Sequence, residues 1–174
     1  MKTTTEMQLV PIAKLVPYYL AYGSNLNMEQ MHYRCPGAVP LGAAELEGYR
    51  LLFKGSKTGA YLTIEKADGF TVPIGVWAVT EADEKRLDCY EGFPTFYYKE
   101  NLDIIYTGLL SKKAHRVNAF VYIMQEDRPF GIPSHMYVST CSQGYTDFGF
   151  NQETLAQAYA FSKKETLKQW DIIL

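Results

Sequence analysis

The order of the strand and helix signals is the feature that most constrains how this 174-residue chain can fold. Short aromatic and β-branched runs, which are typical of strands, follow one another between glycine- and asparagine-containing turns. Helical patterns interrupt this series but do not alternate with the strands, so the order predicts an α+β fold rather than a doubly wound parallel sheet. The strand patterns occur at residues 18–22, 38–53, 61–64, 72–79, 96–106 and 117–124.

Helix and turn signals divide the rest of the chain. Asp68-Gly69 lies between two strand-like runs and predicts a β-hairpin turn. Gly144 and Gly149 are expected to bracket a loop between the last two helices, and Leu167 and Trp170 are expected in a terminal segment. The expected helices begin at Asn25 or Asn27, at Thr80, at Pro133-Ser134 (running to about Cys141) and at Asn151.

Composition places the chain among ordinary globular proteins. With 14 tyrosines, 9 phenylalanines and 2 tryptophans it is rich in residues that favour pleated sheets. Its length suits one domain with a real core, and no linker or repeat divides it. We therefore expect an N-terminal extension over residues 1–16 and a single domain over residues 17–174.

Charge and cysteine usage argue against several classes of protein. The net charge of −2 and the scattered lysines and arginines argue against binding to nucleic acid or to an anionic membrane. The odd number of cysteines, without a Cys/His cluster, predicts no disulfide framework and no metal site. Pro11, Lys14 and Pro17 interrupt the apolar N-terminal stretch, so we expect neither a signal peptide nor a membrane span, and a cytoplasmic location. Cys35, Cys89 and Cys141 are each expected to be small buried side chains.

The sequence YGSNL at residues 22–26 is the first candidate binding motif. It lies between a predicted strand and the start of a helix, where free backbone amides attract a carboxylate or a phosphate. Gly23 would let the backbone approach such a ligand closely. An equally simple interpretation is a tight turn at Gly23 with Asn25 as a helix cap. The motif matches no nucleotide-binding pattern.

Glu91 is the candidate for proton transfer. It falls at the C-terminal end of a predicted helix, where the helix dipole disfavours a carboxylate, and aromatic residues surround it in the sequence. Both effects would raise its pKa towards the range of a useful general acid or base. The alternative is an exposed last-turn glutamate without a function.

Other residues leave further alternatives open. Asp88 could face the same way as Glu91, as in a two-carboxylate glycosidase, or could be structural, bonding to nearby backbone or an arginine. Tyr122 lies on the strand face opposite the aliphatic alternation and could belong to the core or line a cavity. A nucleophilic triad is not indicated, because His32, His115 and His135 are isolated.

Two separated motifs resemble one known family. Residues 19–26, YLAYGSNL, are similar to the Y-x-A-Y-G-S-N-L signature of gamma-glutamyl cyclotransferases, and residues 87–92 resemble their L-D-x-x-E-G segment. The resemblance extends over roughly residues 18–161. It implies a small, partly open β-barrel of mixed strands with helices packed around it. It also implies Glu91 as the catalytic residue, and a substrate site formed by Tyr19, Leu20, Ala21, Tyr22, Gly23, Ser24 and Tyr122.

The implied activity is the cyclisation of a gamma-glutamyl group, which gives 5-oxoproline and a free amine or amino acid. The resemblance implies no cofactor, no metal, a small-molecule gamma-glutamyl substrate, and a protein that is a monomer or a homodimer. The alternative is a non-catalytic protein of the same fold that binds a small carboxylate.

Overall fold

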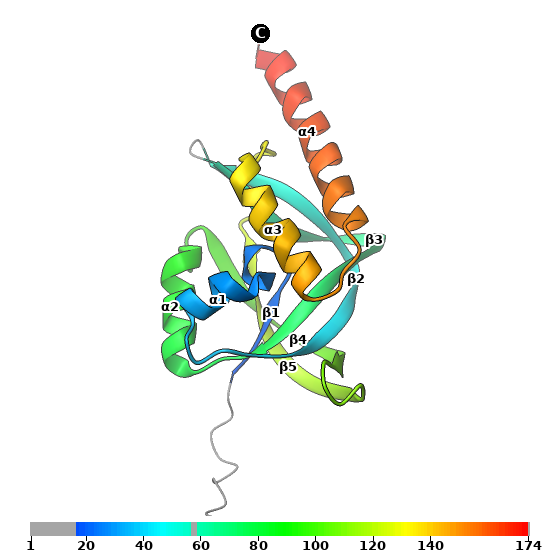
Figure 1. Cartoon of the computed structure of the whole chain (residues 1–174). Helices are drawn as coiled ribbons and strands as arrows, with labels where there is room; N and C mark the ends of the chain where they lie inside the picture. Colours follow the sequence, from blue (N-terminus) through cyan, green and yellow to red (C-terminus); the bar gives the residue numbers. More distant parts are fainter. Residues whose placement is uncertain (1–16, 57–58, 174) are drawn as a thin grey trace, which may run out of the picture.

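The computed structural model describes residues 17–56 and 59–173, so the predicted N-terminal extension over residues 1–16 lies outside the described residues. The described chain forms a five-stranded barrel with helices packed against it (Figure 1). In chain order the elements are β1 (Tyr18–Ala21), the 3-10 helix η1 (Ser24–Leu26), α1 (Met28–Arg34), β2 (Val39–Ser56), β3 (Gly59–Ala78), α2 (Glu81–Glu91), β4 (Tyr97–Gly108), β5 (Ala114–Met124), α3 (His135–Asp147) and α4 (Glu153–Ile173).

The barrel closes because the short first strand lies between two others. The strand order is β1-β3-β2-β4-β5, and β1 completes the ring by pairing with β5. That pairing is parallel, with Tyr19 opposite Phe120, whereas all other neighbours are antiparallel. The predicted α+β barrel of mixed strands is confirmed, and the sheet is closed rather than partly open.

The predicted hairpin at Asp68-Gly69 is wrong. β3 continues through these residues as one strand, and its partner β2 is also continuous. The register jumps from Glu47 opposite Thr71 to Tyr49 opposite Lys66, so β3 accommodates extra residues as a bulge. Gly69 has a φ of +82°, a left-handed conformation that glycine adopts readily. A residue pair typical of turns is therefore suited to this bulge.

Helix α3 is longer than predicted and includes Gly144, where a loop was expected. A Cβ atom on Gly144 would lie 2.5 Å from the backbone nitrogen of Asn27 and 2.7 Å from Cβ of Leu26. This glycine therefore serves close packing of α3 against η1, rather than a break in the helix. The tight contact supports the segment after β1, on which the site described below is built.

The other helix boundaries follow their capping residues. Thr80 and Asp83 form a reciprocal capping box at the start of α2. Asn27, not Asn25, caps α1 by accepting a hydrogen bond from the Gln30 amide at 3.0 Å. Ser134 caps α3, and Asn151 accepts from the Glu153 amide at the start of α4. These caps confirm the predicted starts of the last three helices.

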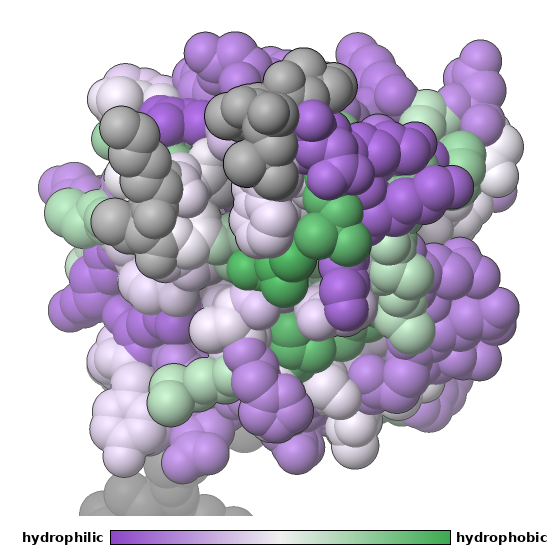
Figure 2. Space-filling view, turned by 90° about the horizontal axis from the view of Figure 1, so that it is seen from above, coloured by the Kyte–Doolittle hydropathy of each residue, from purple (hydrophilic) through white to green (hydrophobic). Residues whose placement is uncertain are grey.

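Helix α4 packs on the barrel with its first half and then extends away from it (Figure 1). Ser162 faces the barrel and accepts a hydrogen bond from the Phe53 amide of β2 at 2.8 Å. Leu167 and Trp170 belong to this helix and are exposed. Seen from above, hydrophobic residues gather near the middle of the face within a hydrophilic rim (Figure 2).

The core runs through the barrel and beneath α1 and α3. Cys35 and Cys141 are buried as predicted, but Cys89, in the last turn of α2, is exposed. In the described part of the chain, no group of three or more His, Cys, Asp or Glu side chains could hold a metal ion. No helix in the same residues is both long and apolar enough to span a bilayer.

Candidate active site

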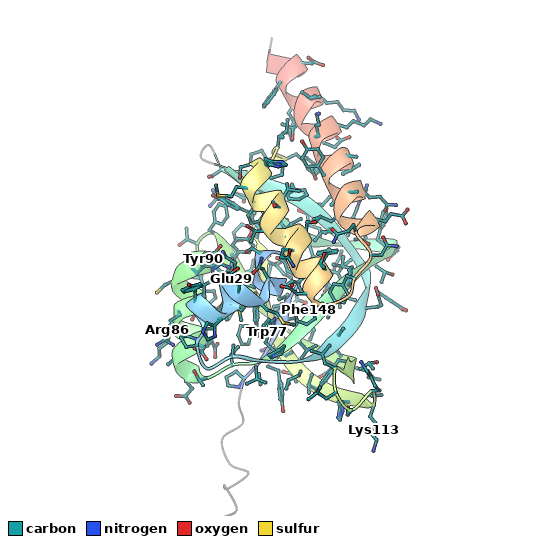
Figure 3. All side chains as sticks on the ribbon, viewed as in Figure 1. Glu29, Trp77, Arg86, Tyr90, Lys113 and Phe148 are labelled. Carbon is teal, nitrogen blue, oxygen red and sulfur yellow. The ribbon has the colours of Figure 1, made fainter. Side chains whose placement is uncertain are left out.

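A pocket of about 400 Å³ opens between the end of β1, the end of α2 and the start of α3. Half of the residues that line it are aromatic, and Glu91 lies among them. Tyr90, at the C-terminal end of α2, is one of the residues that line it (Figure 3). The lining residues are Tyr19, Tyr22, Gly23, Ser24, Asn25, Ser56, Tyr61, Leu62, Cys89, Tyr90, Glu91, Gly92, Phe96, Tyr97, Tyr122 and Tyr137.

The end of α2 brings Glu91 to this pocket. Gly92 adopts a left-handed conformation with a φ of +64° and ends the helix. The amide of Phe93 then donates to the carbonyl oxygen of Asp88 at 2.9 Å, which reverses the chain direction. Glu91 is thus the last helical residue, as the sequence predicted.

Glu91 is held by an amide rather than by a cation. Asn25 Nδ2 donates to Glu91 Oε1 at 2.9 Å. Within residues 17–56 and 59–173, no lysine, arginine or histidine forms an ion pair with its carboxylate. Burial raises the pKa of Glu91 from 4.5 to about 7, although the Arg34 charge and the Asn25 hydrogen bond act in the opposite direction. The predicted rise in pKa is confirmed, and its main cause is desolvation.

Asn25 connects this carboxylate to two further groups. The same Nδ2 atom donates to the hydroxyl of Tyr19 at 2.9 Å, and Arg34 Nη1 donates to Asn25 Oδ1 at 2.6 Å. The amide of Asn25 is buried and has partners on both its nitrogen and its oxygen. The sequence suggested Asn25 only as a possible helix cap, so this role was missed.

The loop after β1 presents backbone to the pocket. No hydrogen bond from the Gly23 or Ser24 amide to another described residue is present. A Cβ atom on Gly23 would lie 3.3 Å from Cβ of Leu62 and 3.5 Å from the Tyr137 hydroxyl oxygen, so a larger residue would crowd this wall. Gly23 and Ser24 line the same pocket as Glu91, so their amides are candidate donors to an anionic group.

Asp88 belongs to a different network. It accepts a hydrogen bond from the Tyr122 hydroxyl at 2.5 Å and forms an ion pair with Lys99 Nζ at 2.7 Å. Lys99 also pairs with Glu84, one helical turn before Asp88. The prediction that Asp88 is structural fits this arrangement, with a lysine of β4 as its partner rather than an arginine.

Comparisons with known proteins agree with this geometry. Residues 19–139 match the family described as gamma-glutamyl cyclotransferase, AIG2-like. The chain belongs to this family.

Two relatives and one solved structure support this membership of the gamma-glutamyl cyclotransferase family. A mouse gamma-glutamylcyclotransferase is 28% identical over 156 residues, which cover 84% of this chain and 79% of that protein. A human gamma-glutamylcyclotransferase is 29% identical over 144 residues, which cover 78% of this chain and 73% of that protein. The solved structure of a gamma-glutamyl cyclotransferase superposes with a TM-score of 0.66 at 26% identity, covering 83% of this chain and 86% of that chain. The predicted family, its enzymatic class and its barrel fold are confirmed.

Most residues predicted for the site of this cyclotransferase-family chain lie together on the pocket. They are Tyr19, Tyr22, Gly23, Ser24, Glu91 and Tyr122. Leu20 and Ala21 are buried in the barrel and do not line the pocket, so any contact they make with a substrate stays a prediction. The sequence did not predict the aromatic wall formed by Tyr61, Phe96, Tyr97 and Tyr137, because these residues come from β3, from the start of β4 with the residue before it, and from α3.

Proposed function

We propose that this chain is a gamma-glutamyl cyclotransferase in which Glu91 is the general acid and base. The observation that carries the proposal is a carboxyl group with a pKa raised to about 7, placed in a pocket that Gly23 and Ser24 also line. Such a group can both accept and return a proton near neutral pH. Membership of the cyclotransferase family supports the same reaction.

The reaction closes a five-membered lactam within one substrate molecule. The neutral α-amine of the gamma-glutamyl group attacks the side-chain amide carbonyl, and a new carbon–nitrogen bond forms. Glu91 accepts one proton from the attacking nitrogen. The original amide bond then breaks, and Glu91 returns the proton to the leaving nitrogen. The products are 5-oxoproline and the free amine, without consumption of water or transfer of electrons.

The pocket would contribute mainly by enforcing a folded substrate. Intramolecular attack of this kind can reach effective molarities of about 10⁵–10⁸ M when the reacting atoms are aligned. The Gly23 and Ser24 amides are suited to hold the substrate α-carboxylate or to polarise the reacting carbonyl. Tyr19 and Tyr22 stay protonated, because burial raises the pKa of each hydroxyl well above its usual value of 10.0. They therefore offer neutral walls for a zwitterionic substrate.

The alternatives are less consistent with the site. A glycosidase would need Asp88 as a second free carboxyl, but Lys99 and Tyr122 already occupy that group. A protein that only binds a small carboxylate has little need of an acid at this position, because binding requires no transfer of a proton.

A product assay tests the proposal. The purified full chain would be incubated with gamma-glutamyl derivatives of amino acids, of the lysine side chain and of simple amines, and 5-oxoproline would be measured by mass spectrometry. We expect release from at least one class, and loss of release in the Glu91→Gln variant. Binding of these compounds without any 5-oxoproline after long incubation would contradict the proposal and favour the binding protein.

A further inference from the structure

Arg34, the last residue of α1, lies behind the pocket wall and is fixed from three sides. Its Nη2 atom donates to Gln30 Oε1 at 3.0 Å within α1 and to the Tyr90 hydroxyl of α2 at 2.5 Å. Its guanidinium carbon also lies 3.7 Å from the centre of the Tyr90 ring. On the third side, Nη1 donates to Asn25 Oδ1 at 2.6 Å and lies 3.4 Å from Ser24 Oγ. A guanidinium held in this way has one orientation.

That orientation determines which way the Asn25 amide points. Its oxygen must face Arg34, because the guanidinium only donates hydrogen bonds. Its nitrogen must then face the pocket, where it donates to Glu91 Oε1 and to the Tyr19 hydroxyl. In the flipped orientation, the amide oxygen would face the Glu91 carboxylate and its N–H groups would face the guanidinium. Both contacts would then be repulsive.

We propose that Arg34 is a positioning residue for proton transfer: acting through Asn25, it holds the Glu91 carboxyl in the orientation in which it meets the substrate. This inference rests on the proposed function. Arg34 is not among the residues that line the pocket, so its effect on Glu91 is indirect: it acts through its charge and through Asn25, the one of its hydrogen-bond partners that also donates to Glu91 in the described structure. The motif at residues 22–26 thus has one more function than binding, because its asparagine transmits this effect.

The charge of Arg34 lowers the pKa of Glu91, and this effect can be measured. The ionisable groups that act on or face Glu91 are Arg34 from α1 and the phenols of Tyr19, Tyr22, Tyr97, Tyr122 and Tyr137 from the barrel and α3. Burial raises the pKa of each of these phenols, so they stay neutral, and Arg34 is the one cation among these described groups. It opposes the effect of burial on Glu91. Without this charge, the pKa of Glu91 would rise further, and less of the basic form would be present at neutral pH.

Arg34→Met and Arg34→Lys separate charge from orientation. In Arg34→Met, we expect the acidic limb of the pH profile of kcat/KM to move to higher pH. If the limb moves by about one pH unit, kcat/KM at pH 7 should fall by about five-fold. Arg34→Lys keeps the charge but loses the planar guanidinium, whose two nitrogens donate to different partners. The acidic limb of its pH profile should therefore stay near that of the wild type, while kcat falls. KM should change less than kcat in both variants, because Arg34 does not line the pocket. Arg86→Met is the matched control, since Arg86 lies on the outer side of α2, pairs with Asp83, and is half exposed (Figure 3).

A second measurement does not depend on turnover. The ¹³C signal of the Glu91 carboxyl carbon, assigned with Glu91→Gln, would be titrated in the wild type, in Arg34→Met and in Tyr90→Phe. We expect a higher midpoint in Arg34→Met, and a smaller change in the same direction in Tyr90→Phe, which keeps the ring under the guanidinium and loses one hydrogen bond. Unchanged midpoints and unchanged profiles would overturn the role of Arg34. Absence of 5-oxoproline from the wild type would instead contradict the proposed function, while the titration would still report on Arg34.

Discussion

Asp88 and Glu91 lie three residues apart near the end of the same helix, yet their surroundings make them different acids. Asp88 has a cation at 2.7 Å and a phenolic donor at 2.5 Å. Glu91 has one neutral amide donor at 2.9 Å, and burial raises its pKa to about 7. A carboxylate with a cation beside it is stabilised in its charged form and contributes to the fold. A half-buried carboxyl without such a partner has a pKa closer to 7 and can exchange protons.

The largest effect expected from this comparison is on turnover. Glu91→Gln keeps the shape of the side chain and an oxygen that can accept from Asn25, but it cannot take up a proton from the substrate. We expect kcat to fall by about 10²–10⁴-fold, the usual contribution of a general acid or base. Asp88→Asn is the matched variant and should retain activity within about ten-fold of the wild type. Equal losses of kcat in the two variants would contradict the difference between Asp88 and Glu91.

The same Glu91→Gln variant should be more stable than the wild type at high pH. A pKa raised from 4.5 in the unfolded chain to about 7 in the folded chain means that the folded state binds the proton more tightly. The wild type is therefore penalised as pH rises from about 4.5 through about 7, by up to about 3 kcal/mol. Urea unfolding at pH 4 should give equal stabilities, and unfolding at pH 8 should favour the variant. A variant less stable than the wild type at pH 8 would show that the charged form of Glu91 does not destabilise the folded chain.

A smaller and opposite effect is expected for Asp88. Asp88→Asn removes a charge that accepts from both Tyr122 and Lys99, and Lys99 keeps only Glu84 as its ion-pair partner. We expect the free energy of unfolding to fall by about 1–2 kcal/mol at pH 7, in line with hydrogen bonds to charged groups that are partly exposed. Thermal unfolding of the wild type and of Asp88→Asn at pH 7 would measure this loss, and equal stabilities would contradict it.

Local signals predicted much of this fold and of this site. The capping residues placed the starts of the helices, and the position of Glu91 beside Gly92 predicted a carboxylate with a raised pKa at the end of a helix. These features depend on neighbours in the sequence, so the sequence reveals them. Two separated motifs in the expected order identified the family, which implied the barrel.

The predictions that failed depend on contacts between distant segments. Asp68-Gly69 has the residues of a turn, but its pairing with β2 makes it a bulge in a continuous strand. Gly144 has the residue type of a helix end, but close packing against η1 requires it inside α3. Asn25 and Asp88 obtain their partners from Arg34, Glu91 and Lys99, and no local pattern specifies these pairings.

The most direct test of the central claim is the pH dependence of kcat/KM for 5-oxoproline release by the wild-type chain. If Glu91 acts as the base with the pKa that burial imposes, kcat/KM should rise with pH through an apparent pKa of about 7. The Glu91→Gln variant should lack this limb. A wild-type profile that is already flat between pH 5 and pH 8, with release intact, would contradict the account.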